Sequence, residues 1–133
     1  MTIGLMLVSH GPLGEVLLDI AVKNLNVCPL ATATLSIPLD VDPDALQERA
    51  CRLIDELDSG DGVLVLTDIF GATPSNIACT LSRHHHVMVV AGINLPMLMR
   101  VLNYPQLSLA ELAERAVDGG RQGVMLMPGG NEA

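Results

Sequence analysis

Apolar residues along this chain follow two patterns, and the two alternate. Short continuous runs typical of buried strands span residues 3–8, 32–37, 62–67 and 87–91. Between them, apolar residues recur at helical spacing, as in Leu13, Val16, Leu17 and Ile20, and similar helices are predicted from residue 43 to 57 and from 73 to about 82. Because strands and helices alternate, we expect parallel strands in one α/β domain.

Capping residues mark the expected helix boundaries. Asp42 followed by Pro43 predicts a helix start, and the polar, glycine-containing segment 58–62 ends that helix. Thr73 followed by Pro74 predicts the next start, with Thr73 as a candidate N-cap. These signals separate the helices from the strands on either side.

After residue 92 the chain is predicted to be mostly helical. Asn94 caps a short helix, residues 108–111 match a capping box, and the Gly119-Gly120 pair is expected to end the helix that follows. Residues 123–127 form an apolar stretch that predicts a last short strand, paired at a sheet edge or with another subunit.

The predicted architecture is a single doubly wound, mainly parallel sheet with helices on both faces and a short C-terminal edge strand, which either stays in its own chain or is exchanged in a dimer. Residues 1–127 make one domain and residues 128–133 a flexible tail. Half of the 133 residues are hydrophobic but only 2% are aromatic, which predicts an aliphatic core of the kind that suits buried parallel strands.

Several classes of protein do not fit the composition. No apolar run approaches the roughly 18 residues of a membrane span, and the N-terminus lacks a basic segment, so we expect a cytoplasmic protein without a signal peptide. The three cysteines, Cys28, Cys51 and Cys79, are widely spaced and predict reduced thiols, neither a disulfide framework nor a zinc ribbon. A formal net charge of -8 argues against nucleic-acid binding and favours a basic protein partner, although acidity also serves solubility.

Two polar residues that follow apolar strands are the candidate catalytic groups. His10 ends the first strand and Asp68 follows the third. Carboxyl ends of parallel strands open onto the crevice in which α/β proteins bind ligands, and neighbouring strands lie about 5 Å apart there. A histidine that attacks phosphorus through one ring nitrogen needs an acceptor for the proton on the other, and a carboxylate meets that need. We therefore expect His10 and Asp68 to be in contact.

The segment after Asp68 is a candidate phosphate site. Gly71 and Ala72 provide slim backbone, and Thr73 and Ser75 provide hydroxyls at the start of a helix. Helix N-termini present unpaired amides and a positive dipole end, so a phosphoryl group finds counter-charge there without Lys or Arg. The run His84-His85-His86 is expected to alternate faces along a strand, which argues against a metal site.

The chain resembles the mannose-family enzyme IIA domain of the bacterial phosphoenolpyruvate-dependent phosphotransferase system. The resemblance runs through nearly the whole chain and is carried by four segments: residues 3–11 (IGLMLVSHG), 66–76 (LTDIFGATPSN), 90–98 (VAGINLPML) and 120–124 (GRQGV). One departure is Ala72, where the family often has a second glycine.

The resemblance implies that His10 accepts a phosphoryl group from a phosphorylated HPr-type carrier and donates it to a IIB partner for sugar uptake. It implies that Asp68 orients His10, that no metal or organic cofactor takes part, and that the chain forms a homodimer by exchanging its last strand. Because no IIB domain follows in this sequence, a stand-alone regulatory phosphorelay stays open beside sugar transport.

Other functions fit the residues less completely. A tetrapyrrole chelatase also places His-Gly after its first strand, but it needs a second convergent histidine and leaves the 67–74 segment unexplained. A histidine phosphatase needs an arginine before His-Gly, and Ser9 stands there. The phosphocarrier subunit of dihydroxyacetone kinase begins similarly but fits residues 71–76 less well. A non-catalytic sensor that binds partners according to the phosphorylation of His10 also stays open.

Overall fold

The computed structural model describes residues 2–38, 40, 42–69 and 71–129. Its regular part is a four-stranded parallel sheet with strand order β2-β1-β3-β4. The strands are β1 (Gly4–His10), β2 (Thr32–Ile37), β3 (Val63–Thr67) and β4 (Val87–Ala91). The helices are α1 (Leu13–Leu25), α2 (Pro43–Leu57), α3 (Thr73–His84), α4 (Leu95–Leu102) and α5 (Leu109–Gln122). The expected parallel, doubly wound α/β fold is confirmed.

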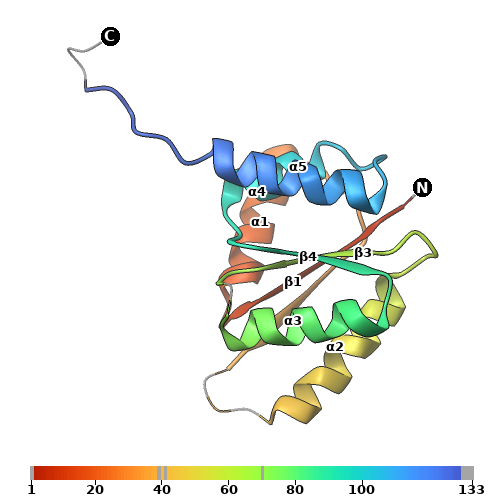
Figure 1. Ribbon diagram of the computed structural model, residues 1–133. Helices are drawn as coiled ribbons and strands as arrows, with labels where there is room; N and C mark the ends of the chain where they lie inside the picture. Colours follow the sequence, from red (N-terminus) through yellow and green to blue (C-terminus); the bar gives the residue numbers. More distant parts are fainter. Residues whose placement is uncertain (1, 39, 41, 70, 130–133) are drawn as a thin grey trace.

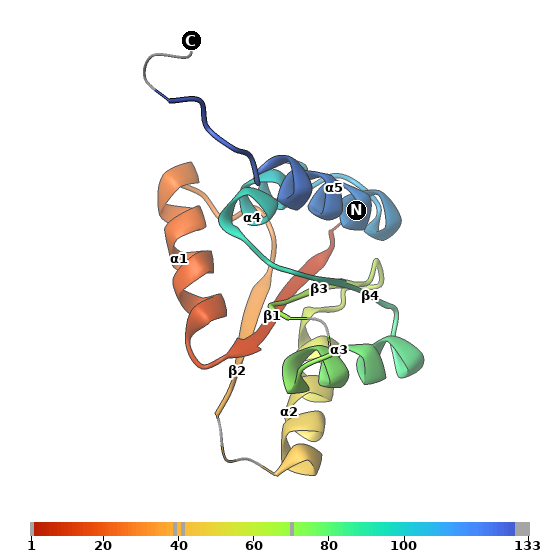
Figure 2. The ribbon, with the colours of Figure 1, turned by 60° about the vertical axis from the view of Figure 1, so that its left-hand side comes forward.

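Helices cover both faces of the sheet (Figures 1 and 2). α1, α4 and α5 lie on one face, and α2 and α3 on the other. Each face has its own aliphatic core, because alternate strand residues point in opposite directions. In β1, Leu5 and Leu7 enter the first core, whereas Met6 and Val8 enter the second. Burial on both faces explains why the strands are continuous apolar runs.

Three of the four predicted caps, Asp42, Asn94 and Ser108, are present, and the fourth, Thr73, is not. The Asp42 side chain accepts a hydrogen bond from the Asp44 amide, and that of Asn94 accepts one from the Met97 amide. Ser108 and Glu111 form the reciprocal capping box. α3 differs, because its N-cap is Ala72, which has no side chain able to cap, and Thr73 is already the first helical residue.

Two C-terminal expectations are wrong for the single chain. α5 does not end at Gly119-Gly120 but continues to Gln122. A Cβ atom built on Gly119 would lie 2.6 Å from the Arg100 Cβ, and one on Gly120 would lie 2.8 Å from the Met97 methyl group. The glycines therefore let α5 pack closely on α4 instead of ending the helix.

The expected strand over residues 123–127 is not formed in the single chain. After α5 the described chain runs on without regular structure as far as residue 129, away from the sheet (Figure 1). Its apolar side chains are exposed, and Leu126 is 99% exposed. Residues 130–133 of the expected tail lie outside the described residues. None of the described helices combines the length and apolar character that crossing a membrane requires.

Candidate functional site

His10 and Asp68 meet at the carboxyl edge of the sheet, where the adjacent strands β1 and β3 end. Val8 of β1 is level with Thr67 of β3, so Asp68 follows β3 where His10 closes β1. The Nδ1 atom of His10 lies 2.9 Å from Asp68 Oδ2, and the same oxygen accepts a hydrogen bond from the His10 backbone amide at 2.8 Å. The expected contact is therefore present.

The environment of Asp68 keeps its carboxyl group ionised. Burial raises the pKa of Asp68, but hydrogen bonds from the backbone amide and ring of His10 and from the Ile69 amide outweigh it, and the pKa lies below its ordinary value. An ionised carboxylate only accepts hydrogen bonds, so in the neutral imidazole of His10 the proton is on Nδ1 and the free lone pair is on Nε2. The His10 side chain is 46% exposed and that of Asp68 is 7% exposed. The pair therefore combines a fixed, buried acceptor with an accessible imidazole.

The turn after His10 is shaped by glycine and by Ser9. Gly11 has a φ of 51°, in the left-handed region that favours glycine, and its amide donates to the Ile37 carbonyl. The buried Ser9 hydroxyl accepts a hydrogen bond from the Gly14 amide at 2.8 Å. Ser9 thus ties the start of α1 to the end of β1. Sequence reasoning noted Ser9 only as the residue before His10, although a small hydroxyl residue before a helix start is a recognisable anchoring signal.

The predicted phosphate-binding residues lie in the loop after Asp68 and in the first turn of α3. Gly71 has a φ of 89°, and its amide donates to the Ser75 hydroxyl at 2.8 Å. Ser75 is buried, whereas Thr73 is exposed on the first turn of α3. A hydrogen bond therefore links Gly71 to Ser75. Thr73 and the half-buried Ala72 form the outer part of the helix start.

The first turn of α3 lies beside the end of β1 in both ribbon views (Figures 1 and 2). Side chains alternate between the two faces of a strand, and Met6 and Val8 face α2 and α3. His10 is two residues after Val8, so it is on the same face of β1. The α3 start has no side-chain cap and no acidic residue in its first turn. The positive end of the α3 dipole is thus at the strand edge that carries His10, and its first turn contributes no carboxylate of its own.

The three consecutive histidines lie at the other end of the sheet. His84 is the last residue of α3, His85 follows it as the C-cap, and His86 precedes β4. They occupy a helix end and a turn, not the strand positions expected for them. In the described part of the chain, no three His, Cys, Asp or Glu residues are grouped as a metal site would require. A second histidine near His10, which a chelatase requires, is not supplied by this run.

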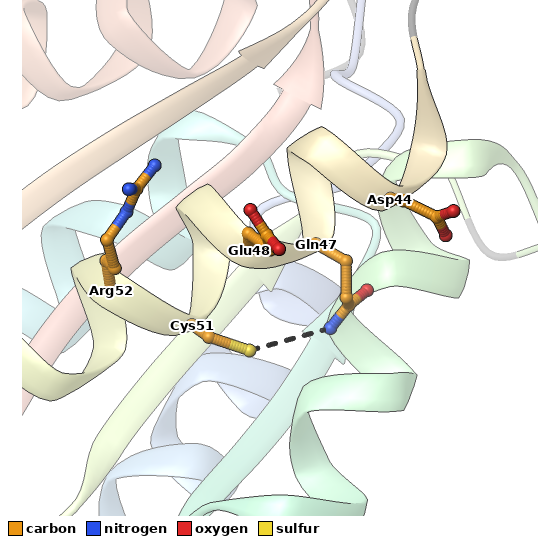
Figure 3. A pocket seen from close by; sticks show the side chains of 5 residues that line it. All are labelled: Asp44, Gln47, Glu48, Cys51 and Arg52. Atoms are coloured by element: carbon orange, nitrogen blue, oxygen red, sulfur yellow. Dashed lines mark hydrogen bonds between the residues drawn. The ribbon is translucent and has the colours of Figure 1, made fainter.

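A hollow of about 660 Å³ on the surface of α2 is a separate feature (Figure 3). Its five lining residues, which include Asp44, Cys51 and Arg52, all belong to that one helix. The Gln47 amide nitrogen lies 3.9 Å from the Cys51 sulfur. The hollow contains neither His10 nor Asp68, so the candidate site is the open strand edge and not this depression.

Comparison with known proteins agrees with the geometry. The family model of the PTS system fructose IIA component, EIIA-man, matches residues 4–117. The PTS system mannose-specific EIIAB component of Escherichia coli (strain K12) is 33% identical over 127 residues, which cover 93% of this chain and 39% of that protein. The chain thus spans well under half the length of that relative.

The fold has close counterparts among solved structures. The mannose/sorbose specific IIA subunit of the phosphotransferase system from Enterococcus faecalis has a TM-score of 0.86 and 28% identity, with 96% of each chain covered. A phosphotransferase system component EIIA from Streptococcus agalactiae, at 19% identity and a TM-score of 0.81, shares the fold. With the family match across most of its length, the chain belongs to the mannose-type enzyme IIA family of the phosphoenolpyruvate-dependent phosphotransferase system.

Proposed function

We propose that the chain is a phosphocarrier in which His10 accepts a phosphoryl group from a phosphorylated HPr-type protein and passes it to a IIB protein. The single observation that carries this proposal is the contact between His10 Nδ1 and the buried Asp68 carboxylate. That contact leaves Nε2 as the nucleophilic atom of a half-exposed side chain.

The transfer needs no metal or organic cofactor in this proposal. The Nε2 lone pair of His10 forms a bond to phosphorus while the bond from phosphorus to the donor breaks, and its electron pair leaves with the donor. Asp68 keeps the proton at Nδ1 and stabilises the positive charge that develops on the ring. Discharge to the IIB acceptor is the same displacement in reverse, with His10 as the leaving group.

The start of α3 is proposed to receive the phosphoryl oxygens. Gly71, Ala72, Thr73 and Ser75 form this start. The Gly71 and Ala72 amides already donate within the protein, whereas the Thr73 and Ser75 amides have no acceptor among the described residues and offer an anion the donors and dipole end of a helix N-terminus. Segment 66–76 has no Lys or Arg, so neutral donors are the counterpart of the phosphoryl charge. Such a site binds the group without holding it as an ion pair would, which suits onward transfer.

The surface around His10 is proposed to dock the protein partners. Leu13, Val16 and Ile20 form an exposed apolar stripe on α1, which begins just after His10, and Ile69 beside Asp68 is 62% exposed. Exposed acidic residues adjoin this edge: Glu15, Asp40, Asp42 and Asp44. An apolar centre with an acidic rim fits a partner whose docking face is apolar and basic.

The C-terminal segment is proposed to complete a homodimer. β4 is at the edge of the sheet, and the exposed apolar residues Val124, Met125, Leu126 and Met127 extend from the end of α5. An unpaired strand edge and an unpaired apolar segment on the same chain fit each other when two copies exchange the segment.

The test is intact-protein mass spectrometry after incubation with phosphoenolpyruvate, enzyme I and HPr, beside His10→Ala. We expect an acid-labile gain of one phosphoryl group that requires HPr and is absent from the variant. No gain with active upstream proteins would overturn the proposal. If the protein is phosphorylated but transfers nothing to any IIB partner, the regulatory relay replaces the transport role.

A further inference from the structure

Thr67 carries a buried hydroxyl group that pairs with none of the residues that the structure describes. The residue is fully buried at the end of β3, and its Oγ1 atom has no hydrogen-bond partner among the described residues. A buried polar group without a partner is unfavourable, and valine would fill the same volume without that penalty. Packing alone therefore does not explain why threonine stands here.

The position of Thr67 relates the hydroxyl to the candidate site. Thr67 continues the alternation of Val63 and Val65, which face the core under α2 and α3. It is level with Val8 on β1, so His10 lies two residues further along the neighbouring strand on the same face. Such positions are neighbours on one face of the sheet, about one strand spacing apart across it and two residues apart along it.

A second unsatisfied feature lies over the same end of the sheet. The first turn of α3 has no side-chain cap, and the described residues give the Thr73 and Ser75 amides no hydrogen-bond acceptor. Ser75 is buried there, and its hydroxyl already accepts from Gly71. An unpaired hydroxyl from β3 and the uncapped first turn of α3 thus lie at the same end of the sheet as His10, and both can donate hydrogen bonds.

We propose that Thr67 is a phosphoryl-binding residue whose hydroxyl, unpaired in the resting protein, donates a hydrogen bond to an oxygen of the phosphoryl group on His10. This inference rests on the proposed phosphorylation of His10. Thr67 then adds a donor from β3 to those of α3. The free-energy cost of burying an unpaired hydroxyl is present only in the unphosphorylated protein. Phosphorylation then removes that penalty, so Thr67 favours the charged carrier over the empty one.

The variants that isolate the hydroxyl are Thr67→Val and Thr67→Ser. Valine keeps the shape and removes the donor, whereas serine keeps the donor and removes a methyl group. Thr32→Val on β2 is the matched control, because Thr32 is at the opposite, amino end of the sheet. Each variant is brought to equilibrium with an excess of HPr of known phosphorylation level, and the phosphorylated fraction is measured by intact mass.

For Thr67→Val we expect the ratio of phosphorylated to free protein to fall about tenfold, the size of one hydrogen bond to a charged group. Thr67→Ser and Thr32→Val should stay close to the original protein. The phosphorus NMR shift of phosphorylated His10 should change in Thr67→Val and be restored in Thr67→Ser, which a purely structural role would not produce. Thermal unfolding of unphosphorylated Thr67→Val should occur at the same temperature or higher.

An unchanged ratio and shift in Thr67→Val would overturn the inference while leaving the phosphocarrier function standing. A lower unfolding temperature for the unphosphorylated valine variant would also overturn it, because the hydroxyl would then be paired at rest. If the original protein itself takes up no phosphoryl group, the proposed function fails, and that result is separate from any comparison of variants.

Discussion

One carboxylate oxygen, Oδ2 of Asp68, accepts hydrogen bonds from both the backbone amide and the ring Nδ1 of His10, at 2.8 and 2.9 Å. The backbone bond fixes the end of β1, and the ring bond fixes the imidazole on it. The other oxygen, Oδ1, accepts from the Ile69 amide at 2.8 Å. Asp68 therefore has little freedom to turn away, and the orientation of His10 is set before any partner arrives.

Replacing Asp68 by Asn tests the charge of this acceptor. Asparagine retains an oxygen that can accept from Nδ1 but loses the negative charge that stabilises the developing imidazolium. We expect the rate of phosphorylation to fall about 10- to 100-fold, as for other carboxylates that orient a histidine. The measurement is single-turnover transfer from phosphorylated HPr. A rate within twofold of the original would contradict an orienting and stabilising role.

The stability of the protein should depend on Asp68 in acid. The folded-state pKa of Asp68 is below its ordinary value of 3.8, so its contribution to the free energy of unfolding is present above that value. It is lost as the pH falls through the lower, folded-state pKa. The difference in stability between the protein and Asp68→Asn should be constant at neutral pH and shrink below about pH 4.

Asp58 provides the control for this acid dependence. Backbone hydrogen bonds from Gly60 and Gly62 lower the pKa of Asp58 as well. Asp58→Asn should therefore reduce stability with the same sign of pH dependence, yet leave phosphoryl transfer intact, because Asp58 is at the far end of the sheet. Urea unfolding curves measured across pH give the difference in the free energy of unfolding between the original protein and Asp68→Asn. An increase of this difference in acid would contradict this account.

Gly119→Ala should destabilise the fold even though alanine is the better helix former. The added Cβ would lie 2.6 Å from the Cβ of Arg100, so α4 and α5 would have to separate. We expect a loss of about 1–3 kcal/mol in the free energy of unfolding, larger than the gain of about 1 kcal/mol in helix propensity. Asp118 is the exposed neighbour of Gly119, so Asp118→Ala is the control. Equal stability of the two variants would show that α4 can shift away from α5 without loss of stability.

Val16→Lys tests the proposed docking surface on α1. Val16 is 51% exposed, and a lysine there places a positive charge in the path of a basic partner. We expect the association rate with phosphorylated HPr to fall by about tenfold at low salt, with less effect at high salt. Val27→Lys, at a position 57% exposed beyond the far end of α1, should transfer normally. Equal rates for both variants would show that the docking surface does not include Val16.

Leu126→Asp tests the proposed exchange of the C-terminal segment. The side chain is 99% exposed in the single chain, so the substitution should leave its thermal unfolding almost unchanged if the protein is a monomer. If two copies exchange the segment, a charge at this apolar position weakens the dimer. Sedimentation velocity of the protein at several concentrations, beside this variant, measures the difference, and a monomeric original protein would refute the exchange.

The sequence by itself determined the order of elements and the caps that can be seen locally. The run of β-strand residues 87–91 and the capping signals at Asp42, Asn94 and Ser108 depend on near neighbours in the chain, and the structure agrees with them. Placing His10 and Asp68 at the same edge also followed from the sequence, because both come directly at the ends of apolar strands.

Tertiary structure decided what depends on residues far apart in the chain. Gly119-Gly120 has the local signal of a helix end. In the structure the two glycines lie where α5 packs closely on α4, and the helix continues past them to Gln122. Residues 123–127 have the pattern of a strand, but a strand needs a partner edge, and the single chain gives them none. The unpaired Thr67 hydroxyl likewise became visible only when its surroundings were assembled, since the pattern of residues does not reveal which buried polar atoms lack a partner.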